Sequence, residues 1–196
     1  MKIKKFFLLS LFTIAMLFGR AQEIQVSEVP TAAVDKFNAD HGNLPTYIKP
    51  TWYKVVQTGG TKTFYKVSYM NGTQFETYGY NMNGAELYKR FDWYNANAYN
   101  AIPALVELVK AVKIAFPGRT VQKVAEMRSA RYNLNGYPVV LDDMRTRNFD
   151  LSNKVTQVKY AEAIEAAIFA DATNFLAATA SPGSTPNNLP KSTESK

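Results

Sequence analysis

The feature that most constrains this chain is an internal repeat. The stretch SEVPTAAVDKFNADHGNLPTYIKP, residues 27–50, matches NAIPALVELVKAVKIAFPGRTVQKV, residues 100–124. Both contain an apolar residue followed by Pro, a run with helical spacing, a break that contains Pro, and a short segment with Lys. Self-similarity of this kind indicates a structural unit that occurs more than once. We therefore expect a tandem duplication in which Pro30 corresponds to Pro103.

The similarity continues into segments with the alternation of β-strands. FYKVSY, residues 64–69, corresponds to GYPVVLD, residues 136–142, and YNMNGA corresponds to FDLSNK. The turn sequences TGG, NG and NMNG favour hairpins, and Pro suits the first turn of a helix. Each copy is thus predicted to be one helix packed on an antiparallel sheet, an α+β fold. The expected strands are 51–57, 63–70, 74–81 and 85–91 in the first copy, and 120–127, 136–142, 144–150 and 155–160 in the second.

Residues 1–21 have the pattern of a cleavable secretory signal peptide. Three lysines precede an apolar run, which ends at Gly19, Arg20 and Ala21, so that Gln22 would begin the mature chain. An uncleaved membrane anchor is the alternative, but the apolar run is shorter than the roughly 20 residues that a spanning helix needs.

Charge and cysteine content narrow the class of protein. The chain has 23 basic and 16 acidic residues, and loss of four basic residues with the signal would leave 19 against 16, a net charge of +3. That balance does not favour nucleic acid as a partner. The chain has no Cys, so it has no disulfide and no lipobox cysteine for lipid attachment. We expect a periplasmic or secreted protein that does not insert into the membrane after cleavage.

The mature chain divides into four predicted parts. Residues 22–100 and 101–160 form the two repeats. Residues 161–180 form an amphipathic C-terminal helix, since apolar residues recur on one stripe and acidic residues lie in its first turn. Residues 181–196 are rich in Pro, Ser, Thr and Asn and are predicted to be disordered.

Catalytic signatures are absent from the sequence. His41 is the only histidine and is interpreted as a solvated loop residue, which leaves no His cluster for a metal. Asp142 and Asp143 are adjacent, so a strand would direct them to opposite faces. We expect no catalytic residue, no metal and no cofactor, and therefore a protein that is not an enzyme.

The motifs described above resemble a known family. The VP and IP helix starts, the FPG break before a Lys-bearing strand, the YKVSY strand and the YNMNG hairpin are similar to the PepSY-like proteins related to beta-lactamase inhibitory protein. The similarity covers residues 27–160. It implies tandem repeats, a location in the bacterial envelope or outside the cell, and a sheet face that binds a partner protein. The second copy departs from the pattern at its last hairpin, where Asn153 replaces the glycine.

Aromatic residues are concentrated in the first copy, and alternation predicts where they point. Tyr65, Val67 and Tyr69 should face the helix, while Phe64, Lys66 and Ser68 face away from it. Aromatic and basic side chains on an uncovered face are typical of an interface, although β-propensity and cross-strand packing also explain them. The predicted partner-binding residues, expected to be exposed or at the edge of this face, are Trp52, Phe64, Lys66, Phe75, Trp93 and Tyr94.

Two functions are compatible with these observations. The first is an exported, non-enzymatic module that binds a protein or peptide, with inhibition or regulation of an envelope hydrolase as the role that the resemblance implies. The alternative is a structural envelope protein, or one that binds a small apolar ligand between helix and sheet. The identity of a protein partner is not given by the sequence.

Overall fold

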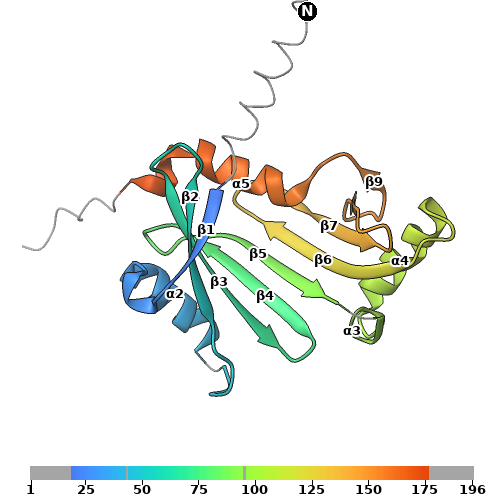
Figure 1. The fold of residues 1–196 in the computed structure, drawn as a ribbon, viewed down its shortest axis with the longest axis horizontal. Helices are drawn as coiled ribbons and strands as arrows, with labels where there is room; N and C mark the ends of the chain where they lie inside the picture. The colour runs from blue at the N-terminus through green and yellow to red at the C-terminus, as the bar shows by residue number, and fades with distance from the viewer. Residues whose placement is uncertain (1–18, 43, 95, 177–196) are drawn as a thin grey trace, which may run out of the picture.

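The computed structural model describes residues 19–42, 44–94 and 96–176, and within them the chain forms one antiparallel sheet of nine strands (Figure 1). Each strand pairs with the next one along the chain, so the sheet order is the chain order. The strands are β1 (Gly19–Ile24), β2 (Thr51–Gln57), β3 (Thr63–Asn71), β4 (Gln74–Tyr80), β5 (Glu86–Trp93), β6 (Val121–Ser129), β7 (Leu134–Leu141), β8 (Thr146–Phe149) and β9 (Val155–Thr156). The helices are α2 (Thr31–His41), α3 (Ala96–Asn100), α4 (Pro103–Ala115) and α5 (Tyr160–Ala170), with short 3-10 turns η1 (Val26–Glu28) and η2 (Ala172–Phe175).

The predicted α+β class and antiparallel pairing are confirmed, and most strand boundaries differ by only one or two residues. One expected strand is wrong in its length, and one strand was not predicted. The strand expected over 155–160 ends at Thr156, because Tyr160 already begins α5. The strand that was not predicted is β1, which pairs with β2 from Gly19 to Ile24 and so includes the last residues of the expected signal segment. Residues 1–18 of that segment lie outside the described residues.

One face of the sheet is covered by α2 and α4. Ala33 and Phe37 of α2 belong to a buried cluster that includes Val67 of β3, and Leu108 of α4 belongs to a second cluster that includes Val139 of β7. Phe91 of β5 contacts both clusters, so the two helices lie on the same side. Pro30 and Ile102 precede the two helices as N-caps, and Pro103 occupies the first turn of α4, where its missing N–H is not needed.

The opposite face is partly covered by α5, drawn in orange across one end of the sheet in Figure 1. Ile164 and Ile168 are fully buried against a row of side chains contributed by β2, β3, β5 and β6. That row consists of Val55, Phe64, Leu87 and Met127. At the start of the helix, the Tyr160 ring lies against Gly136, where any side chain would collide with the ring. The glycine therefore allows α5 to approach β7.

The C-terminal helix is shorter than the sequence predicts. The expected helix over 161–180 is wrong from Asp171 to Leu176, because α5 ends at Ala170 and Asp171 is the N-cap of η2. Residues 177–180 of that span lie outside the described residues. Its side chain accepts a hydrogen bond from the backbone N–H of Thr173 at 3.0 Å. The buried Asn174 then donates to the Ile168 carbonyl at 3.0 Å, which holds the turn against the helix. The predicted disordered tail, residues 181–196, lies outside the described residues.

Candidate functional site

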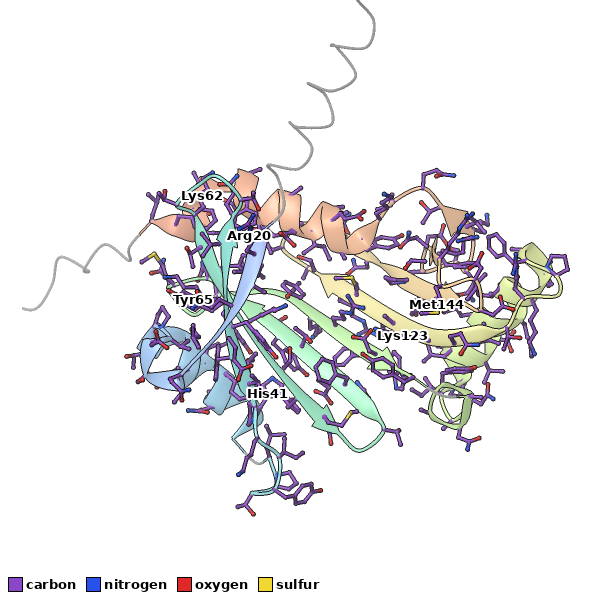
Figure 2. The ribbon with its side chains drawn as sticks, viewed as in Figure 1. Arg20, His41, Lys62, Tyr65, Lys123 and Met144 are labelled. Atoms are coloured by element: carbon purple, nitrogen blue, oxygen red, sulfur yellow. The ribbon has the colours of Figure 1, made fainter. Side chains whose placement is uncertain are left out.

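A groove lies beside α5 on the face of the sheet that α2 and α4 do not cover. It encloses about 450 Å³. Its floor comes from β2 to β6 and its wall from α5. Its lining combines aromatic, hydroxyl and charged side chains, including Lys123, which Figure 2 labels on β6. The lining includes Tyr53, Lys66, Ser68, Phe75, Thr77, Tyr88, Arg90, Asp92, Tyr94, Lys123 and Glu165.

Strand register assembles the row of floor residues next to α5. Tyr53 pairs with Lys66, Lys66 with Gly79, and Gly79 with Tyr88. A side chain at Gly79 would collide with the Tyr88 ring, so the ring lies over the glycine. The Lys66 ammonium lies 5.0 Å from the centre of the Tyr53 ring, in a cation–π contact.

A buried carboxylate with two cations occupies the next rows. Asp92 is only 2% exposed and pairs with Phe75 across β4 and β5. Its carboxylate accepts two hydrogen bonds from the Arg90 guanidinium, at 2.7 and 2.8 Å. It also forms an ion pair with the Lys123 ammonium at 2.8 Å. Burial lowers the pKa of Arg90, but the hydrogen bonds and charge of Asp92 outweigh burial, and the pKa is raised. Arg90 therefore remains a cation.

Tyr94 extends this cluster to the open side of the groove. The Lys123 ammonium lies 4.5 Å from the centre of the Tyr94 ring and 3.3 Å from its hydroxyl. Tyr94 is 51% exposed, whereas the side chain of Lys123 is only 21% exposed. The aromatic ring thus shields the cation from water on one side and presents its other face to solvent.

Lys66 is a different kind of cation, because it has no counterion in contact. Within the described part of the chain its ammonium makes the cation–π contact with Tyr53 but no hydrogen bond and no ion pair. Burial lowers its pKa, and the charge of Arg90 adds to this effect, whereas the more distant Glu165 opposes it. Glu165, on α5, has a pKa raised by burial and accepts a hydrogen bond from the backbone N–H of Gly19.

The structure places three of the six predicted site residues in the open part of the groove: Lys66, Phe75 and Tyr94. Phe64 faces the predicted side but is 3% exposed, because α5 covers it. The centre of its ring lies 5.6 Å from that of Phe169. The predicted exposure of Phe64 is therefore wrong.

The two tryptophans are not at the edge of the groove. Trp52 and Trp93 are each 5% exposed and belong to the clusters under α2 and α4. Their strand positions have the opposite parity to Tyr53 and Asp92, so they point to the other face. The expectation that they border the groove is wrong.

Sequence reasoning missed Arg90, Asp92 and Lys123. The signal for the first two is present in LYKRFDW, where a cation and a carboxylate are two residues apart on a strand and must share a face. The contribution of Lys123 is not local, since it depends on the pairing of β5 with β6.

A second hollow of about 380 Å³ adjoins the groove and shares Arg90, Lys123 and Ala161 with it. It adds Arg145 and Lys159, together with Glu162 at the start of α5. The two hollows together are lined by five basic and three acidic side chains, a net charge of +2. The surface beside α5 is therefore electropositive.

The described residues contain no group of three or more His, Cys, Asp or Glu side chains placed to hold a metal ion. Among them there is also no helix with the length and apolar character needed to cross a bilayer.

Comparison with known proteins assigns neither a family nor a function to this chain. The chain matches no known family profile and no curated protein. Among solved structures it is similar to a predicted periplasmic protein from Bacteroides eggerthii, with a TM-score of 0.48 and 12% identity. The match covers 66% of this chain and 86% of that one. A functional assignment for this chain must therefore come from the residues of the groove.

Proposed function

We propose that this protein is an exported, non-enzymatic module that binds a protein or peptide segment in the groove beside α5. The observation that carries the proposal is the lining of the groove, where half-buried aromatic side chains alternate with largely desolvated cations. Phe75 and Tyr94 supply aromatic anchors, and Arg90 and Lys123 supply directional donors. Aromatic residues and Arg are enriched at the energetic centres of protein interfaces.

Packing under α5 favours this function over an apolar ligand held between helix and sheet. Ile164, Ile168 and Phe169 are each at most 2% exposed, and they fill the space above Phe64 and Met127. The remaining hollow is lined by charged and hydroxyl groups as well as aromatic ones. A lipid-like molecule would leave those polar groups without partners, whereas a peptide offers them its own polar atoms.

The proposal includes the tandem duplication, and two hairpins support it. Asn81 and Asp150 occupy corresponding positions, and each side chain accepts two backbone N–H groups of its own turn, at 2.9 to 3.0 Å. Gly84 and Asn153 then follow with positive φ, 79° and 61°. The same turn built from different residues is what a duplicated unit would retain.

Family and location follow the same proposal. We place the protein with the PepSY-like relatives of beta-lactamase inhibitory protein, secreted or periplasmic, with an envelope hydrolase as the candidate target. Export rests on the charged and apolar pattern of residues 1–21.

Site-specific photocrosslinking tests the binding surface. A benzophenone amino acid is introduced at Tyr94 or Phe75, and at Tyr47 as a control, since Tyr47 is an aromatic residue 81% exposed in the segment after α2. In intact cells, irradiation should yield the same covalent adduct from positions 75 and 94 and none from position 47. Adducts from position 47 alone, or from no position, would rule out the groove as the binding surface.

A further inference from the structure

The charge of the groove indicates which kind of segment it holds. We propose that the groove selects an acidic peptide, whose carboxylates bind Lys66 and the cation pair formed by Arg90 and Lys123. This inference rests on the proposed function and narrows it to one class of ligand. Its basis is the net charge of +2 around the two hollows and the donors that remain free there.

Lys66 is the first element of this site. A half-buried ammonium without a counterion destabilises a fold, because it loses hydration and gains no ion pair in return. Lys66 lies in that situation in the groove floor, between Tyr53 and Gly79. A ligand carboxylate at this point would supply the missing counterion, and its interaction would be strengthened by the partial exclusion of water.

The second element is the cluster at Asp92. Arg90 has five N–H donors and uses two of them on Asp92, while Lys123 has three donors, with one directed to Asp92 and one to Tyr94. Two positive charges share one negative charge. Asp92 therefore fixes the two basic groups in position and leaves donors of the pair for an incoming acceptor.

The remaining lining favours a peptide over a nucleic acid or another long polyanion. Asp92, Glu162 and Glu165 lie among the basic residues and interrupt them, so the lining matches separated carboxylates better than a continuous row of phosphates. The floor between the cations contains the Ser68 and Thr77 hydroxyls, which hydrogen-bond each other at 2.9 Å, and the aromatic rings. Spaced cations separated by aromatic and hydroxyl groups fit alternating acidic and apolar side chains.

A random heptapeptide library on beads provides the probe. Peptides that bind the wild-type protein should be enriched in Asp and Glu together with an aromatic residue. A synthetic peptide from this set should bind at least about tenfold more tightly than its Asn and Gln counterpart, since a charge-assisted contact contributes on that scale. The affinity should fall as salt is added.

Two matched variants locate the effect. Lys66→Met removes the unpaired cation and should weaken the acidic peptide about tenfold without lowering the melting temperature. Lys89→Met changes a lysine of β5 that pairs with Tyr78, on the α2 side of the sheet, and should leave binding unchanged.

Three outcomes would overturn the inference: a library without acidic enrichment, equal binding by the Lys66→Met protein, or tighter binding of an oligothymidine than of any peptide. Photocrosslinking separates this failure from failure of the proposed function. Adducts at positions 75 and 94 with no acidic preference would leave the binding surface in place and remove only the ligand class.

Discussion

Glu76 and Asp92 are buried carboxylates on opposite faces of one sheet, and they are neutralised in different ways. Glu76, 7% exposed, lies on the α2 face. It accepts hydrogen bonds from the Tyr69 and Tyr78 hydroxyls at 2.8 and 2.7 Å and from the Asn71 amide at 2.8 Å. Asp92, on the groove face, is held by two cations instead.

The difference separates a structural network from a binding one. Around Glu76, neutral donors converge on a single charge, the ring of His41 lies against that of Tyr78 at 4.3 Å, and the network is covered by α2. Burial, with the charge of Glu76, raises the pKa of both tyrosines, so their hydroxyls remain donors. Around Asp92, two cations share one carboxylate and line a groove. The donors around Glu76 are therefore all used within the fold, whereas the cations around Asp92 can also bind an anion.

The largest expected effect concerns Phe64 and Phe75, which the sequence placed together on an exposed face. Phe64→Ser should lower the free energy of unfolding by about 4 kcal/mol, because a buried ring under α5 is lost and a hydroxyl is buried in its place. Phe75→Ser, at the half-buried floor, should change it by less than about 1 kcal/mol. Denaturant titration measures both. Equal losses would mean that α5 does not distinguish the two positions.

The carboxylate under α2 gives the next largest effect. Glu76→Ala leaves three donors without their acceptor and should destabilise the protein by about 3 kcal/mol. Glu126→Ala is the control, because its carboxylate pairs with Arg128, whose side chain is 52% exposed and can turn to water. That change should remove no more than about 1 kcal/mol. A Glu76 variant as stable as the Glu126 variant would show that the tyrosine network does not stabilise this face.

The hairpin beneath α2 provides a third test. Gly84 has a φ of 79°, as its hairpin position predicts, and a side chain there would also collide with the carbonyl oxygen of Ala32 in α2. Gly84→Val should therefore destabilise by about 3 kcal/mol. Gly72→Val, at a φ of 61° in open space, carries the backbone strain alone and should remove about 1 kcal/mol. Equal melting temperatures for the two variants would show that the contact with α2 contributes nothing.

The local sequence pattern was sufficient to predict the strands and the face of each side chain, since alternation correctly placed Tyr65, Val67 and Tyr69 opposite Phe64 and Lys66. It did not predict which side chains are exposed where an element from another part of the chain covers them. The apolar stripe of α5 is visible in sequence, but its docking over Phe64 depends on Gly136, far along the chain.

The irregular pairing of β4 with β5 was also not predicted from the sequence. A register shift at Gly79 and Tyr80 pairs Gly79 with Tyr88 and Tyr80 with Glu86, which leaves Leu87 as an extra residue in β5. Leu87 and Tyr88 consequently both contact the α5 side. The prediction that His41 is a solvated loop residue is also wrong, because it is the last residue of α2 and the centre of its ring lies 5.0 Å from that of Phe37.

Alkaline titration should distinguish the two networks with a smaller effect. The pKa values of Tyr69 and Tyr78 are raised by burial above the ordinary 10.0, so ionisation is easier in the unfolded chain. Stability is fully present below pH 10 and should fall as the pH rises above it, by about 1 kcal/mol per tyrosine for the first pH unit. Unfolding midpoints at increasing pH measure the slope. Tyr78→Phe should reduce it, Tyr47→Phe should not, and an unchanged slope in the Tyr78 variant would exclude this cause.

The smallest expected effect is at Lys66, where removing a charge should cost no stability. Its ammonium has no ion pair within the described residues, and burial lowers its pKa below the ordinary 10.5, so the cation is less favourable in the folded chain than in the unfolded one. Lys66→Met keeps the aliphatic contact with Tyr53 and should stabilise the free protein by up to about 0.5 kcal/mol. Lys123→Met instead leaves Asp92 with only Arg90 and should destabilise by about 1 kcal/mol. If Lys66→Met proved the more damaging change, then Lys66 would have a structural counterion and the groove face would be as complete as the face under α2.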